Sequence, residues 1–181
     1  MRKPDFDKRW LAVLDPLCRK LASAIFATCA LRVVDGTKYG IDQVIYHDDL
    51  AYGYLEVEYV DPKSGRFTHN KYHSPVEKGI SIPIRKDKFF LRYTPSWWMN
   101  FSSDLTHFII LPGSVVMSGR ISRYKPHNNK VAEEYRIVEL NHPNATRWRI
   151  MNSLRHQTLM LFAHERPDLH HMMRNLPLLY N

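Results

Sequence analysis

Three acidic side chains lie where a short β-hairpin could bring them together. Asp42 ends the sequence Tyr39-Gly40-Ile41-Asp42, and Glu56-Val57-Glu58 begins fourteen residues after it. A hairpin turn centred near Asp49 would pair Asp42 with Glu56, and the same register would pair Gly40 with Glu58. Because side chains alternate along a strand, Glu56 and Glu58 share one face. The spacing predicts three carboxylates on one face of a sheet.

Such a cluster of like charges is stable only where water, a proton or a cation offsets the repulsion. Oxygen ligands suit Mg²⁺ or Mn²⁺, and a bound ion could activate water and neutralise charge that develops on a phosphodiester. Asp42, Glu56 and Glu58 are therefore candidate metal ligands and catalytic residues. The alternative is that Glu56 and Glu58 form the solvated face of an ordinary amphipathic strand, which shows the same alternation.

A helix, a hairpin that bears an Asp, and a following Glu-x-acidic triplet together resemble the PD-(D/E)XK nuclease superfamily over about residues 7–111. The resemblance implies a restriction-endonuclease-like fold, with Asp42 as the metal-binding aspartate and Glu56 as the second metal ligand. Glu58 stands where the family usually has a lysine. Some restriction enzymes of the superfamily carry Glu-x-Glu, whereas loss of the lysine can also mark a lost activity.

The family's lysine assists the attacking water, and this chain offers a replacement in the run Arg85-Lys86-Asp87-Lys88. We expect Lys86 to take that part as a fourth catalytic residue. Arg85 suits bidentate contact with a phosphate because its guanidinium is a planar fork.

Basic and aromatic side chains elsewhere could hold the nucleic acid itself. Trp97 and Trp98 could stack on unpaired bases, although at least one of two adjacent tryptophans is more often part of a core. A basic helix face near the C-terminus could follow a phosphate backbone, or could simply be solvated. The predicted nucleic-acid-binding residues are Arg85, Lys88, Arg92, Trp97, Trp98, Arg147, Arg149 and Arg155.

Composition sets the class of protein. The chain has 181 residues and a formal net charge of +8, which favours polyanionic partners. Its length predicts a single domain, residues 1–181, and its apolar runs are too short to span a bilayer. Cys18 and Cys29 are eleven residues apart, too far for a disulfide on one helix, so we expect two buried thiols and a cytoplasmic location.

The elements that position these residues follow from hydrophobic periodicity. Apolar residues at helical spacing predict a long first helix over 7–33. Asp7 can cap its start, and Pro16 can bend it. A β-prone run at 41–46 and a longer strand over 51–60 predict the hairpin. An extended segment over 79–84 and a strand over 89–93 follow, the short apolar run 106–111 predicts a buried central strand, and two or three strands are expected within 114–140 around a polar loop at 125–130. A last helix over 145–163 would bury Trp148, Met151, Leu154, Leu161 and Phe162.

These elements predict an α/β fold with a mixed β-sheet flanked by helices. The function we expect is metal-dependent hydrolysis of DNA or RNA with Mg²⁺ or Mn²⁺. One alternative is a non-catalytic module that binds nucleic acid or protein, for example an inactive descendant of the nuclease fold. The other is a structural protein of a larger complex. The pairs His69 and His73, and His170 and His171, lack a third ligand at zinc-site spacing and are expected at the surface.

Overall fold

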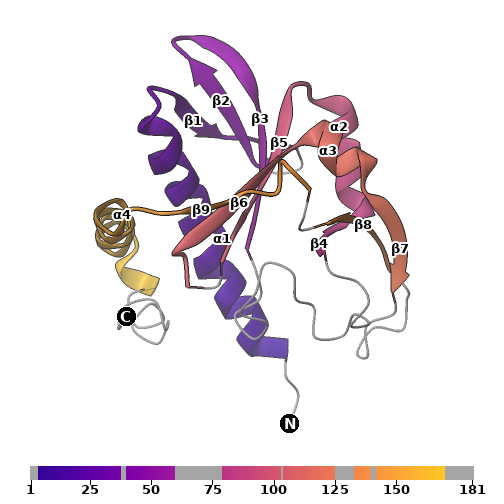
Figure 1. The fold of residues 1–181 in the computed structure, drawn as a ribbon. Helices are drawn as coiled ribbons and strands as arrows, with labels where there is room; N and C mark the ends of the chain where they lie inside the picture. The colour runs from indigo at the N-terminus through magenta and orange to yellow at the C-terminus, as the bar shows by residue number, and fades with distance from the viewer. Residues whose placement is uncertain are drawn as a thin grey trace.

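A six-stranded mixed sheet forms the centre of the fold (Figure 1). The computed structural model describes residues 4–37, 40–59, 79–102, 104–124, 133–139 and 142–169. The strand order is β1-β2-β3-β5-β6-β9, in which β3 and β5 are parallel and all other neighbours are antiparallel. Its strands are β1 (Arg32–Asp35), β2 (Gln43–His47), β3 (Leu50–Tyr59), β5 (Ser96–Phe101), β6 (His107–Pro112) and β9 (Arg147–Arg149).

A second, antiparallel sheet of order β4-β8-β7 lies beside the first, with two short helices next to it (Figure 1). It consists of β4 (Gly79–Pro83), β7 (Arg120–Tyr124) and β8 (Glu133–Glu139). The adjoining elements are the 3₁₀ turn η1 (Ile84–Lys86), α2 (Asp87–Arg92) and α3 (Gly113–Ser118). The predicted α/β fold with a mixed sheet and flanking helices is thereby confirmed.

The helix α1 (Pro4–Ala27) packs on one face of the six-stranded sheet. Its buried residues recur at helical spacing and form one stripe, which meets Leu55, Val57 and Met99 in the larger hydrophobic core. The members of that stripe are Val13, Leu14, Leu17, Cys18, Leu21 and Ala22. Beyond α1 lie α4 (Asn152–Glu165) and the 3₁₀ turn η2 (Pro167–Leu169).

The opposite face of the sheet carries a second core. Trp98, Ile109 and Leu111 point toward β4, α2 and α3 there, and all three are buried. Leu55 and Val57 belong to the α1 core, so the alternation of β3 turns Glu56 and Glu58 toward this second side. The two carboxylates are therefore placed between the six-stranded sheet and the segment that contains η1 and α2.

The hairpin of β2 and β3 has the predicted register near the site, but it reaches that register by another route. Its turn is centred between Asp48 and Asp49 rather than on Asp49 as predicted. Tyr52 is an extra, bulged residue in β3, and it shifts the register so that Gln43 pairs with Leu55. Gly53 follows this bulge, where a Cβ atom would lie 2.1 Å from the Trp97 ring. Gly40 pairs with no strand residue, which corrects its predicted pairing with Glu58.

Several predicted element boundaries were wrong. The first helix begins at Pro4 and ends at Ala27, because Ala30 adopts a left-handed backbone (φ 57°) and the β-branched residues after it form β1. Residues 89–93, predicted as a strand, lie mostly in α2, where only Phe90 is buried. Residues 96–101 form a strand instead. The segment 113–118 is helical before β7 and β8 begin.

The predicted last helix is divided between β9 and α4. Arg147, Trp148 and Arg149 pair with β6, and the backbone N–H of Ile150 donates to the Thr106 carbonyl at 2.8 Å. Trp148, Met151 and Leu161 are consequently exposed, which corrects their predicted burial; Phe162 is buried as predicted. The loop 125–130 and the histidines at 69, 73, 170 and 171 lie outside the described residues.

Both cysteines are free thiols. Cys18 is buried in the α1 core, but Cys29 is exposed after the end of α1, which corrects the expectation that both are buried. Within the described ranges, none of the helices has the length and apolar character needed to cross a membrane.

Candidate active site

The fold brings the cation predicted at position 86 to the predicted carboxylates. Lys86 Nζ lies 2.5 Å from Glu56 Oε2 and 3.1 Å from Glu58 Oε1. The two glutamates come from β3 and the lysine from the end of η1, thirty residues later in the chain. Lys86 therefore places a positive charge beside Glu58, the third residue of the Glu-x-Glu triplet, which does not itself supply one.

Glu56 is fully buried, with 0% of its surface exposed, and its Oε1 atom has no hydrogen-bond partner within the part of the chain that the structure describes. Burial disfavours the charged form and, with the nearby Asp42 carboxylate, raises the pKa of Glu56 to about 7, although Lys86 opposes the shift. One carboxylate oxygen is thus held by the lysine while the other is left without a ligand. A buried acceptor of this kind is costly unless something fills its coordination.

Lys86 stays positively charged in this environment. Burial by itself would lower the pKa of Lys86, but the carboxylates of Glu58, Glu56 and Asp42 outweigh it and raise the pKa. The ammonium is therefore a fixed positive charge at the site rather than a base at neutral pH.

Asp42 is held by contacts from two sides. Arg19 of α1 donates to Asp42 Oδ1 at 2.7 Å, and the backbone N–H of Val57 donates to Oδ2 at 2.9 Å. Arg19 also lies 3.2 Å from Asp15, whose pKa is raised mainly by burial. Asp42 directly precedes β2 and the Gln43–Leu55 pair, so the predicted strand pairing of Asp42 with Glu56 is not formed, although its carboxylate is close enough to raise the pKa of Glu56.

A partly buried ion pair fixes the segment that carries Lys86. Asp87, the next residue, accepts hydrogen bonds from Arg136 Nε at 2.9 Å and from Nη2 at 2.8 Å, while Arg136 Nη1 donates to the Met117 carbonyl at 2.7 Å. This fork links β8, α3 and the start of α2. The second sheet therefore serves to hold the lysine against β3.

The residues fit a divalent cation only in part. Among the described residues, no group of three or more His, Cys, Asp or Glu side chains is arranged to hold a metal ion. Asp42, Glu56 and Glu58 are thus not assembled as a set of three ligands, because Lys86 engages both glutamates and Arg19 engages the aspartate. Glu56 Oε1 has no hydrogen-bond partner among the described residues, and Mg²⁺ commonly binds through one or two carboxylates with water and phosphate as its other ligands.

The other predicted residues separate into two groups. Arg85, Lys88 and Arg92 lie on η1 and α2 with Lys86, and all three are exposed. Arg147 and Arg149 lie on β9, and Arg155 on α4, at the other end of the molecule from α2 (Figure 1). The C-terminal arginines therefore do not form one continuous surface with the site.

The predicted tryptophan platform is not formed. Trp98 is 2% exposed in the second core, which confirms that one of the pair is a core residue. Trp97 packs against the α1 core and stacks on Tyr52, with ring centroids 6.0 Å apart. Trp98 lies on the same face of the sheet as its neighbour Glu56 but is buried, whereas Trp97, the neighbour of Leu55, lies on the α1 face.

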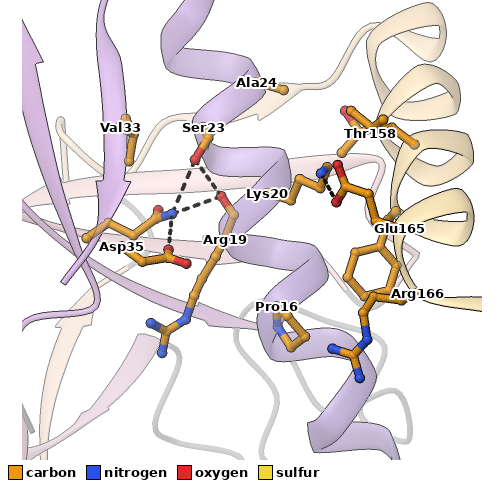
Figure 2. A pocket seen from close by; sticks show the side chains of 13 residues that line it. Pro16, Arg19, Lys20, Ser23, Ala24, Val33, Asp35, Thr158, Glu165 and Arg166 are labelled. Carbon is orange, nitrogen blue, oxygen red and sulfur yellow. Dashed lines mark hydrogen bonds and ion pairs between the residues drawn. The ribbon is translucent and has the colours of Figure 1, made fainter. Parts of the chain in front are cut away.

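Arg19 is a site residue that no motif in the sequence predicts. Its approach to Asp42, twenty-three residues later, depends on how α1 crosses the start of β2. Arg19 lines a pocket of about 570 Å³ between α1, α4, β1 and β2. Figure 2 shows the Arg19 side chain at this pocket. Near it, Gln43 Nε2 donates to the Arg19 carbonyl, to Ser23 and to Asp35, which fixes α1 on β1 and β2.

Comparisons of the chain with protein-family models, with curated proteins and with solved structures found no match in any of the three.

Proposed function

We propose that this protein is a divalent-metal-dependent nuclease that hydrolyses phosphodiester bonds of DNA or RNA. The observation that carries the proposal is the position of Lys86, whose ammonium lies against the two glutamates of the Glu-x-Glu triplet, beside Asp42. A buried carboxylate beside a partly exposed one, with an adjacent fixed cation, is an arrangement suited to phosphate chemistry, because negative charge develops on the phosphate in the transition state. The net charge of +8 supports a polyanionic substrate.

Each side chain has a separate task in this proposal. Asp42 and Glu56 would hold the ion, which when bound supplies activation of water and neutralisation of phosphate charge. Lys86 orients Glu56 and Glu58 and offers its ammonium to a phosphate oxygen or to the attacking water. Arg19 and the Val57 N–H keep the Asp42 carboxylate fixed, so that little reorganisation is needed during the reaction.

The test is cleavage of single- and double-stranded DNA and RNA in Mg²⁺ or Mn²⁺. We expect cutting by the wild type and its loss in Asp42→Asn, Glu56→Gln and Lys86→Ala. The matched control is Asp48→Asn, which removes one carboxylate from the exposed hairpin turn, where asparagine tolerates the φ of 52°. Cutting that continues in chelator, or that survives Glu56→Gln, would contradict the proposal.

A second function, binding of nucleic acid without catalysis, is favoured by a specific observation. Lys86 and Arg19 form ion pairs with all three carboxylates, so the cluster has counter-charges without a metal ion. A binding module predicts affinity that falls steeply with salt and does not change in chelator. Absence of cutting together with such binding would favour the module over the nuclease.

We also propose a cytoplasmic location, which the free thiols of Cys18 and Cys29 support because exposed free thiols persist in reducing compartments.

A further inference from the structure

An aromatic pair adjoins the candidate active site on the same face of β3. Tyr54, Glu56 and Glu58 are two residues apart along a strand that pairs regularly with β5, so their side chains share one face. Neighbours on such a face are about 7 Å apart, which is close to the length of one nucleotide in an extended strand. Tyr54 therefore lies about one nucleotide away from Glu56.

The segment 86–93, which runs from the end of η1 through α2 to Tyr93 just after it, supplies a matching row opposite β3. Its Lys86 contacts Glu56 and Glu58 at one end, and Tyr93 meets Tyr54 at the other, with ring centroids 4.9 Å apart and planes tilted by 43°. Phe89 lies between them in sequence, and its ring is 5.6 Å from Lys86 Nζ. The carboxylate site is thus continued by aromatic side chains in one direction.

Positive charge accompanies these rings. The Arg92 guanidinium lies 5.5 Å from the Tyr93 ring centre and is exposed, and Lys88 Nζ lies 4.8 Å from the Phe89 ring centre. Half-buried rings with exposed cations beside them are the features that hold unpaired bases and their phosphates. A duplex offers no such contact, because its bases are already stacked and paired.

We infer that Tyr54 and Tyr93 form a stacking subsite for an unpaired base next to the phosphodiester that is cut, which makes single-stranded nucleic acid the substrate. This inference rests on the proposed nuclease function, because it takes Glu56 and Lys86 as the place where the phosphodiester is cut. Arg92 contacts the phosphate of the stacked nucleotide.

The experiment is fluorescence anisotropy in chelator, where no cutting occurs, with a labelled single-stranded DNA, a single-stranded RNA and a DNA duplex. We expect both single strands to bind at least tenfold more tightly than the duplex. Tyr54→Leu and Tyr93→Leu each weaken single-strand binding by about tenfold, the size ordinarily lost with one stacked base, and leave duplex binding unchanged. Tyr93→Phe, which keeps the ring, binds as the wild type does.

The matched control is Tyr52→Leu, since Tyr52 lies on the same strand and is half-exposed, but stacks on Trp97 at the α1 side. Equal effects of Tyr52→Leu and Tyr54→Leu, or equal binding of duplex and single strands, would overturn the subsite. Thermal unfolding of each variant separates lost contact from lost structure. Metal-dependent cutting without tyrosine dependence would refute the subsite alone, whereas tyrosine-dependent binding without any cutting would refute the nuclease alone.

Discussion

At the scale of single residues, Glu56 links the candidate site to folding. Its ordinary pKa of 4.5 is raised to about 7 in the folded chain, mainly by burial. The folded state therefore holds a proton that the unfolded state has lost between these two values. The stabilisation is fully present below pH 4.5 and is lost as the pH rises through about 7.

We expect the free energy of unfolding, measured with urea in chelator, to fall by on the order of 3 kcal/mol between pH 4.5 and pH 8 because of this group. Glu56→Gln, which cannot ionise, should flatten the profile. Glu165→Gln, at an exposed ion pair on α4, is the control and should keep the slope. Identical profiles for the two variants would contradict this account.

A second prediction concerns Lys86. Lys86→Met leaves Glu56 buried without its cation, and removal of one partner of a buried pair ordinarily costs about 3–5 kcal/mol. We expect that loss of stability at pH 8 and a much smaller one at pH 5, where Glu56 is protonated. Lys88→Met changes an exposed lysine two residues away and should have little effect at either pH, so a loss equal at both pH values would count against the buried pair.

These residues show how far sequence reasoning reaches at this scale. Asp42 and Glu56 could be placed near each other from the hairpin register, and Lys86 could be chosen as the replacement cation because the run at 85–88 follows the hairpin. Arg19 could not be found in this way, because its contact with Asp42 depends on the crossing of α1 over β2.

At the scale of elements, the fork between Arg136 and Asp87 sets where η1 places Lys86. We expect Arg136→Lys to lower the free energy of unfolding by about 2 kcal/mol, since a lysine cannot reproduce the paired hydrogen bonds. Cleavage should fall as well, because the ammonium loses its fixed position. Arg123→Lys, on the exposed side of β7, is the control for urea denaturation and cleavage; equal losses in both variants would show that the fork is not special.

Elements were predicted well where periodicity was strong and poorly where pairing decided the outcome. The β3 strand and the stripe of α1 follow from alternation and helical spacing. In contrast, Trp148 was assigned to a helix because apolar residues around it fit that period, and only pairing with β6 makes it part of a strand. Residues 89–93 are equally ambiguous in composition, and the packing of Phe90 in the second core selects the helix.

At the scale of the whole molecule, two hydrophobic cores meet the six-stranded sheet from opposite sides, and the candidate site lies where β3 separates them. The fold class was predictable, since a helix followed by a hairpin and further strands leads to a mixed sheet. The division into two sheets was not predictable, because β4 pairs with β8, a strand more than fifty residues later in the chain.

The whole-molecule prediction concerns ion binding to the folded state. An ion at one hundred times its Kd should stabilise the fold by about 2.7 kcal/mol, since the unfolded chain has no preformed site. We expect MnCl₂ to raise the Tm of the wild type and of Asp48→Asn by several degrees, and to leave Asp42→Asn and Glu56→Gln unchanged. Thermal unfolding with and without the ion measures this, and an equal rise in all four proteins would indicate non-specific binding.

The two free thiols also give the molecule a built-in reporter of motion. Cys29 is open to solvent after α1, whereas Cys18 lies at the contact of α1 with the sheet, where burial raises the pKa of its thiol. We expect a maleimide reagent to alkylate Cys29 at once and Cys18 only when α1 lifts away from β3. Mass spectrometry of the second adduct over time would then record how often the helix that carries Arg19 releases Asp42.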